Sequence, residues 1–230
     1  MKVFITQSNY IPWKGYFDAI NMADVFVLYD DMQYTKGDWR NRNRIKTSNG
    51  IQWLTIPVQV SGKFLQKICD TDVDKQFWRK KHWQCIKHNY LKTPFFSEYE
   101  SLFETLYLSD TEDSLSRINY RFLRAVSEIL NIKTEFKWSE EFDLKGDKTE
   151  KLVNICKNLN ATQYISGPSA RNYLNETLFE ENGIEVVWMD YTGYPEYPQQ
   201  FGPFDHAVSI LDLLFNVGPA APSFMKSFTS

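Results

Sequence analysis

The sequence has little of what builds disulfide frameworks or structural metal sites. Only 3 of its 230 residues are cysteine, at Cys69, Cys85 and Cys156, and their number is odd and their spacing unlike that of zinc ligands. Histidine and cysteine residues form no cluster along the chain. Neither a disulfide scaffold nor a structural metal is therefore indicated, and a reducing, cytoplasmic location is expected.

Long apolar runs and an excess of positive charge are also missing. No segment approaches the roughly 20 apolar residues of a membrane span, and the N-terminal apolar run is too short for a signal peptide. The formal net charge is −3, which argues against general binding to nucleic acid. We therefore expect an intracellular protein with no membrane span and no nucleic-acid partner; its oligomeric state stays open.

What the sequence does contain is a local concentration of cations. Arg40, Arg42, Arg44 and Lys46 stand two residues apart, so on a β-strand all four side chains project from one face. An Asn-Gly pair follows at 49–50, and 52–58 is rich in strand-forming residues, so the pattern predicts a β-hairpin. The opposite face of the first strand would carry Trp39, Asn41, Asn43 and Ile45.

Two interpretations of this cationic face compete. Edge strands often carry Lys and Arg, which discourage pairing with other chains, so the face could simply be solvated. Arginine, however, suits planar, bidentate recognition of phosphate or carboxylate better than lysine does. Three of the four cations are arginines, and we favour an anion-binding site.

The first 30 residues follow the pattern of a βαβ unit. Short apolar strands are predicted at 2–6 and 24–30, and the spacing of apolar residues over 13–22 is that of a helix face. Such a unit makes a parallel pair of strands, whose carboxyl ends are where ligands collect. Polar residues follow both strands and should converge with the hairpin on one edge: Gln7, Ser8, Asn9 and Tyr10 after the first, and Asp30, Asp31, Gln33 and Tyr34 after the second.

The middle of the chain is predicted to be helical, at 74–91, 98–108 and 115–130. We read 74–130 as a helical insertion or subdomain within a single domain, 1–230. His82 lies in the first of these helices and is a candidate for acid–base chemistry, because an imidazole titrates near neutral pH. A lone histidine on a helix is more often structural.

The last third returns to alternating strands and helices. Strands are predicted at 135–138, 163–165 and 184–189, with helices at 151–159, capped by Thr149, and at 209–215; the tail from Gly218 is expected to be loose. The fold class is therefore α/β: a Rossmann-like parallel sheet with a β-hairpin and a helical insertion. The 163–165 strand leads into a turn and helix that could bind an anion or be only a turn, through Ser166, Gly167, Ser169 and Arg171.

Four blocks of sequence resemble the WbqC-like family found in gene clusters for bacterial O-antigen and other surface polysaccharides. They are QSNYIPWKGYFDAINMADVFVLYDDMQYTKGDWRNRNRIKTSNGIQWLTIPV, the W..KH....NY...PFF segment, YISGPSARNYL and SILDLLFNVG, which together span nearly the whole chain. Ser8 departs from the proline common there. The resemblance implies a cytoplasmic role in lipopolysaccharide biosynthesis on an activated sugar, and it implies functional weight on Gln7, Tyr10, Trp13, Gly15, Asp30, Gln33, Tyr34, Trp39, Arg40, Asn41, Arg42, Lys46, His82, Tyr90, Ser166, Gly167 and Tyr173.

The predicted function is a transferase that forms an amide on a nucleotide-linked amino sugar, using an activated acyl or aminoacyl donor. The three arginines would hold the diphosphate, Trp39 or Tyr34 would stack on the base or sugar, and Asp31 or His82 would deprotonate the amine. No cofactor is certain. Two alternatives stay open: nucleotidyl transfer with Mg²⁺ on Asp30 and Asp31, and a non-catalytic partner of the polysaccharide machinery that uses the aromatic 191–204 loop as its contact surface.

The nucleotidyl-transfer alternative comes from a weaker likeness. The order strand, Pro-x-x-Gly-aromatic, helix, strand is similar to the opening of class I nucleotidyl transferases, in which two histidines flank the glycine. Trp13 and Tyr16 stand at those positions here, which makes adenylyl transfer doubtful.

Overall fold

Five parallel strands form the central sheet of the computed structural model, which describes residues 1–74, 77–109 and 111–228. Their order across the sheet is β5-β2-β1-β6-β7. Counted along the chain, this is third, second, first, fourth, fifth, the strand order of a Rossmann fold. The bounds are β1 Lys2–Thr6, β2 Val25–Leu28, β5 Glu135–Trp138, β6 Gln163–Ser166 and β7 Glu185–Trp188.

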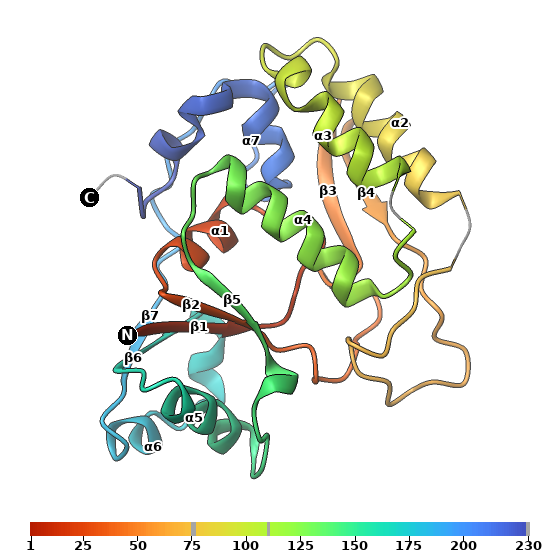
Figure 1. Cartoon of the computed structure of the whole chain (residues 1–230). Helices are drawn as coiled ribbons and strands as arrows, with labels where there is room; N and C mark the ends of the chain where they lie inside the picture. The colour runs from red at the N-terminus through yellow and green to blue at the C-terminus, as the bar shows by residue number, and fades with distance from the viewer. Residues whose placement is uncertain (75–76, 110, 229–230) are drawn as a thin grey trace.

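Helices cover both faces of the sheet. In Figure 1, α1 (Lys14–Asn21) and α4 (Leu115–Ile129) lie above it, and α5 (Lys148–Asn158) and α6 (Glu176–Glu180) lie below it. Side chains alternate accordingly: Phe4 joins the apolar core on the α1 and α4 side, whereas Val3 and Ile5 join the core on the α5 side. The predicted Rossmann-like α/β fold and its opening βαβ unit are confirmed.

The sheet has a switch point between β1 and β6. The helix after β1 covers one face and the helices beside β6 cover the other, so the two connections diverge at the carboxyl ends of these neighbouring strands. Ligands of open parallel sheets bind in the crevice that forms at such a point.

The segment between β2 and β5 contains the predicted hairpin and helices. β3 (Arg42–Thr47) and β4 (Gly50–Thr55) pair antiparallel, with Arg44 opposite Trp53, and α2 (Trp78–Tyr90) packs on α3 (Phe96–Leu108). The Trp83 ring of α2 stacks with the rings of Phe96 and Tyr107, and the ring centroids are 5.8 and 6.0 Å apart. The apolar cluster above the sheet runs without interruption into these helices.

Three local predictions are wrong. The helix predicted after Ser166 is only a five-residue 3-10 helix, Pro168–Asn172, and α5 begins earlier than predicted, capped by Asp147, whose carboxylate accepts from the backbone N–H groups of Thr149 and Glu150. The C-terminal tail is packed rather than loose: α7 (Ile210–Val217) continues into a 3-10 helix, Gly218–Phe224, and the backbone N–H groups of Lys226 and Ser227 donate to the buried Asp18 carboxylate.

The helices in the described part of the chain are short. The longest, α4, has 15 residues, and none of the helices there has both the length and the apolar character needed to cross a membrane.

Candidate functional site

A buried carboxylate fixes the loop that follows β1. The Asp30 side chain is 1% exposed and accepts hydrogen bonds from the Ser8 backbone N–H at 2.8 Å and from the Ser116 hydroxyl. Burial raises the pKa of Asp30, and these hydrogen bonds oppose the shift. Asn119 of α4 adds a bond of 2.9 Å to the Ser8 hydroxyl. Asp30 therefore holds the site together and has no open approach for a ligand.

The hairpin holds the next part of the same loop. Ile11 has a φ of +37°, a strained value for a β-branched residue. The Asn43 amide nitrogen donates to the carbonyls of Tyr10 and Ile11 at 3.0 and 2.9 Å, and its oxygen accepts from the Arg44 N–H at 2.8 Å. A strained backbone of this kind persists only where surrounding contacts hold it in place. Here the hydrogen bonds from Asn43 of β3 hold the loop between β1 and α1 in its shape.

Arg40 joins the two loops across the carboxyl edge. Its Nη2 donates to Gln7 Oε1 at 2.8 Å and its Nη1 donates to Asn9 Oδ1, and Asp38 lies 3.6 Å from Nη2. The Arg40 side chain is 16% exposed. Arg40 is therefore the cation best placed to meet an anionic ligand.

The other cations of the hairpin share one face, as the alternation predicts, but they do not converge on a point. Arg42 and Arg44 lie over the Trp53 ring, with their Cζ atoms 4.3 and 5.6 Å from the ring centroid. Arg44 Nε donates to the Ala207 carbonyl at 2.8 Å, and the buried Lys46 ammonium donates to the Pro203 carbonyl. Backbone carbonyls carry partial negative charge, so these two cations fasten segment 203–207 to the hairpin.

That fastening closes a pocket of about 330 Å³, here called the hairpin pocket. Three of its eight lining residues are Trp or Tyr: the Trp13 and Tyr191 rings meet edge-on with their centroids 5.2 Å apart, and Trp39 comes from the loop that precedes β3. Gly15 is required beneath Trp13, because a Cβ at Gly15 would lie 2.3 Å from the Trp13 ring. The pocket is lined by Asn9, Pro12, Trp13, Trp39, Asn43, Tyr191, His206 and Ala207.

His206 is a functional candidate that sequence reasoning missed. It lines the hairpin pocket, and its Nδ1 is buried without a hydrogen-bond partner among the described residues. Burial, with the charge of Lys14, lowers the pKa of His206, so the imidazole is neutral at pH 7 and can accept a proton. It stands in an irregular segment with no periodic pattern, so no sequence signal marked it.

The predicted base His82 lies in the interior instead. Its side chain is 7% exposed, its Nδ1 is 2.9 Å from the Tyr10 hydroxyl, and the rings of Trp78 and Tyr107 surround it. Burial lowers the pKa of His82 to about 4, opposed by a hydrogen bond with the Thr55 backbone. His82 lines none of the described pockets. Its place is in a buried polar network with Tyr10.

Asp31, the other predicted base, is already occupied. Lys67 Nζ donates to Oδ1 at 2.9 Å and the Ser139 hydroxyl donates to Oδ2 at 2.6 Å. Burial alone would raise its pKa, but these two hydrogen bonds and the Lys67 charge outweigh burial and lower the pKa of Asp31. Both carboxylate oxygens of Asp31 are therefore already engaged by protein donors.

A second pocket of about 210 Å³ lies against α5, at the carboxyl ends of β1, β2 and β6; we call it the α5 pocket. It contains two predicted ligand-binding residues, Gln7 and Tyr173, and one that the sequence did not single out, Tyr29. Its lining residues are Ile5, Thr6, Gln7, Tyr29, Met32, Lys148, Leu152, Tyr164 and Tyr173. Gln7 therefore belongs to this pocket while it also binds the Arg40 guanidinium, whose other partner, Asn9, lines the hairpin pocket.

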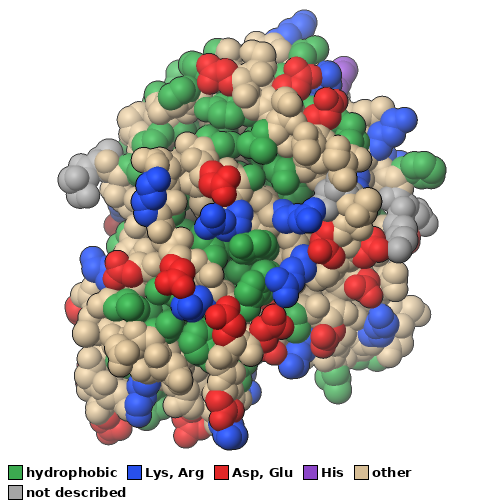
Figure 2. Space-filling view, in the orientation of Figure 1, with side chains coloured by type: hydrophobic (Ala, Val, Ile, Leu, Met, Phe, Trp, Pro, Cys, Tyr) green, Lys and Arg blue, Asp and Glu red, His purple; other side chains and the backbone are tan. Residues whose placement is uncertain are grey.

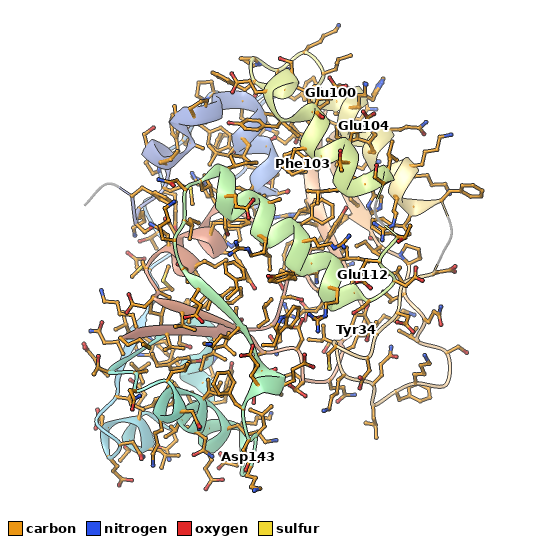
Figure 3. All side chains as sticks on the ribbon, in the orientation of Figure 1. Tyr34, Glu100, Phe103, Glu104, Glu112 and Asp143 are labelled. Atoms are coloured by element: carbon orange, nitrogen blue, oxygen red, sulfur yellow. The ribbon has the colours of Figure 1, made fainter. Side chains whose placement is uncertain are left out.

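The remaining predicted residues lie outside both pockets. Tyr34 is 7% exposed, and its backbone N–H donates to the Gln66 carbonyl at 2.9 Å; its side chain is labelled in Figure 3. Three more bind protein groups: Gln33 donates to the Phe64 carbonyl, Asn41 to the Ile56 carbonyl, and Tyr90 to Asp212. Of the predicted anion-binding turn, Ser166, Gly167, Ser169 and Arg171 line neither pocket, and the Arg171 guanidinium lies over the Trp188 ring at 5.0 Å.

Charges on the visible surface are mixed. Figure 2 shows Lys and Arg side chains across the middle of this face, interspersed with Asp and Glu. Within the described chain, no three His, Cys, Asp or Glu side chains are grouped so that they could hold a metal ion. Each of the four carboxylate oxygens of Asp30 and Asp31 accepts a hydrogen bond from a protein donor.

The loop 191–204 is a wall rather than a free surface. Tyr194 and Tyr197 are each 6% exposed, and the Tyr197 hydroxyl donates to the buried Asp212 carboxylate at 2.8 Å. Lys14, at the start of α1, is held among these rings and donates to the Pro195 carbonyl at 2.7 Å. Tyr194 and Tyr197 therefore do not contribute to the exposed contact surface considered from the sequence, whereas Phe201 of the same loop is 39% exposed.

The strand order and the two pockets at the carboxyl edge define a Rossmann-like α/β protein with a candidate ligand site at its switch point. The chain belongs to the WbqC-like protein family, whose model matches residues 7–224. It is 52% identical over 225 residues to a protein of Mycobacterium tuberculosis named "Uncharacterized protein Rv1507c", a match that covers 98% of this chain and 97% of that protein. No solved structure matches the chain significantly. The family resemblance predicted from the sequence blocks is confirmed.

Proposed function

We propose that this protein is a transferase of surface-polysaccharide biosynthesis that forms an amide on the amino group of a nucleotide-linked sugar. The observation that carries the proposal is His206, whose Nδ1 lacks a hydrogen-bond partner among the described residues, in a pocket lined by Trp13, Trp39 and Tyr191, together with a guanidinium, Arg40, that binds Asn9 of the same pocket. The polysaccharide context comes from the resemblance of the four sequence blocks to the WbqC-like family. The chemistry comes from the site.

The hairpin pocket suits the nucleotide end or sugar of such a ligand. Rings of Trp13, Trp39 and Tyr191 offer flat apolar surfaces for stacking, which contributes about 1–3 kcal/mol per base in other proteins. Arg40, which donates to Asn9 of this pocket and to Gln7, would pair with the diphosphate. An aromatic pocket with a cation at its edge is the combination that a nucleotide diphosphate sugar requires.

Amide formation needs a base, because a protonated amine is no nucleophile. In the proposed reaction, His206 accepts the proton of the ammonium group, the free amine attacks the donor carbonyl, and a nitrogen–carbon bond forms. The attacking nitrogen then gives up a second proton to the leaving group as the bond between the carbonyl carbon and the leaving group breaks, and the leaving group departs with the electron pair of that bond. We assign the base to His206 in place of Asp31 and His82, because His206 is neutral, lacks a partner and faces a pocket.

Nucleotidyl transfer is the weaker alternative. The second histidine position of that chemistry is held by Tyr16, whose hydroxyl donates to the Gln7 carbonyl at 2.8 Å from within the core. Neither it nor Trp13 can protonate or steady a transferring phosphoryl group as an imidazole does.

The test is a product assay. The protein is mixed with UDP-, GDP- and dTDP-linked amino sugars and with acyl thioester or aminoacyl donors, and mass spectrometry follows the sugar. We expect the mass gain of an acyl group, and a loss of about 10²–10⁴-fold in rate for His206→Asn. His88→Asn, which changes an exposed histidine of α2, is the matched control and should keep full activity. Binding of a sugar nucleotide without product from any donor would refute the transferase.

A further inference from the structure

The α5 pocket contains a buried group that lacks a partner. Tyr29, at the end of β2, is 7% exposed, and its hydroxyl makes no hydrogen bond to any described residue. Burial, together with the charge of Asp31, raises the pKa of Tyr29 to about 12, so the hydroxyl keeps its proton and can donate. An unsatisfied buried hydroxyl is costly, which is why such groups are rare and point to a ligand when they line a pocket.

The other polar groups of this pocket are donors too. Gln7 uses its amide oxygen to accept from Arg40, which leaves the amide nitrogen to donate. Lys148, the first residue of α5, contributes an ammonium group. The nearby Asp31 carboxylate is not free to fill the site, because Lys67 and Ser139 hold its two oxygens.

The pocket also has apolar surface, alongside the hydroxyls of Thr6, Tyr164 and Tyr173. Aliphatic surface comes from Ile5 of β1, from Met32 after β2 and from Leu152 of α5, and Tyr164 supplies an aromatic ring. Donors on one part of a pocket and apolar surface on the other select a ligand with acceptor oxygens and a short apolar body. A volume of about 210 Å³ admits only a small molecule or the end of a larger one.

We infer that the α5 pocket is a second ligand subsite, which binds a small organic acid or acyl group through its carboxylate or carbonyl oxygens. Tyr29, Gln7 and Lys148 donate to those oxygens, and the aliphatic residues contact the body of the group. The next step rests on the proposed function: in that reaction, the α5 pocket holds the acyl portion of the donor. Arg40 links the two subsites, since it binds Gln7 of the α5 pocket and Asn9 of the hairpin pocket.

Binding of butyrate tests the inference, with two related probes for comparison. Butan-1-ol has the same apolar body without the anion, and inorganic phosphate is an anion without the body. Ligand-observed NMR titration of the full chain should give the tightest binding for butyrate. Equal binding of butan-1-ol would overturn the role of the donors, and tighter binding of phosphate would overturn the role of the apolar wall.

Two Tyr→Phe substitutions, each of which removes one hydroxyl group, distinguish a loss of binding in the α5 pocket from a general effect on the protein. Tyr29→Phe should weaken butyrate at least about tenfold, the loss expected for a hydrogen bond to a charged group. Tyr34→Phe is the matched control: Tyr34 has the same 7% exposure and also an unpartnered hydroxyl, but it does not line the α5 pocket. Both variants should melt at the same or a higher temperature, because each loses an unsatisfied hydroxyl.

The outcomes distinguish this subsite from the proposed function. Butyrate that binds both variants equally, or does not bind the unaltered protein, overturns the subsite and leaves the hairpin pocket and its transferase assay untouched. Butyrate binding that depends on Tyr29, in a protein that yields no acylated sugar with any donor, keeps the subsite and refutes the transferase.

Discussion

The pH dependence of stability should report the burial of His82. Burial lowers the pKa of His82 to about 4, from 6.5 for a free imidazole. The folded pKa is below the unfolded one, so between these values the unfolded chain binds more protons than the native protein does. The stability that comes from the neutral, buried imidazole is therefore complete above the unfolded pKa and is lost as the pH falls toward the folded pKa.

The shift sets the size of the effect. Integrating proton binding between about pH 7 and about pH 5, with these two pKa values, gives a loss of about 2 kcal/mol from His82 alone. Urea denaturation followed by tryptophan fluorescence at the two pH values measures it. We compare the unaltered protein with His82→Gln, which cannot titrate in this range but can still meet the Tyr10 hydroxyl.

The comparison of pH-dependent losses isolates one residue. Buried Asp30 and Asp212 have raised pKa values and act in the opposite direction, but both are present in every variant and cancel. The unaltered protein should lose about 2 kcal/mol more than His82→Gln between the two pH values. His88→Gln, on the exposed side of the same helix, should behave like the unaltered protein. An equal loss in the His82→Gln variant would mean that His82 is not buried as described.

Three further substitutions test the site. Asn43→Ala removes three hydrogen bonds around the strained Ile11 backbone and should cost about 2–4 kcal/mol in urea unfolding; a cost below about 0.5 kcal/mol would contradict that role. Gly15→Ala should displace the Trp13 ring and weaken nucleotide binding about tenfold in calorimetry with UDP, GDP and dTDP, with little change in melting temperature. Arg40→Lys keeps the charge but not the two-pronged geometry, so affinity for the same diphosphates should fall about tenfold; unchanged affinity would remove Arg40 from the ligand site.

Much of the fold followed from periodicity in the sequence. The stripe Ile118, Phe122 and Val126 predicted the buried side of α4, and all three are at most 1% exposed. The alternation from Arg42 to Lys46 predicted which side chains of β3 share a face, and it is observed. The loops after β1 and β2 meet because parallel strands bring their carboxyl ends to one edge. Each of these features is set by residues a few positions apart in the sequence or by the pairing of two adjacent strands.

Tertiary structure decided what each polar residue does. A helical stripe does not distinguish a cleft from a core, so the sequence could propose His82 as a base, and packing by Trp78 and Tyr107 made it part of the interior. His206 reaches the hairpin pocket only because Arg44 and Lys46 hold the carbonyls of segment 203–207, some 160 residues away along the chain. Which groups lose water, and which are left without partners, depends on such distant contacts, and no local pattern encodes them.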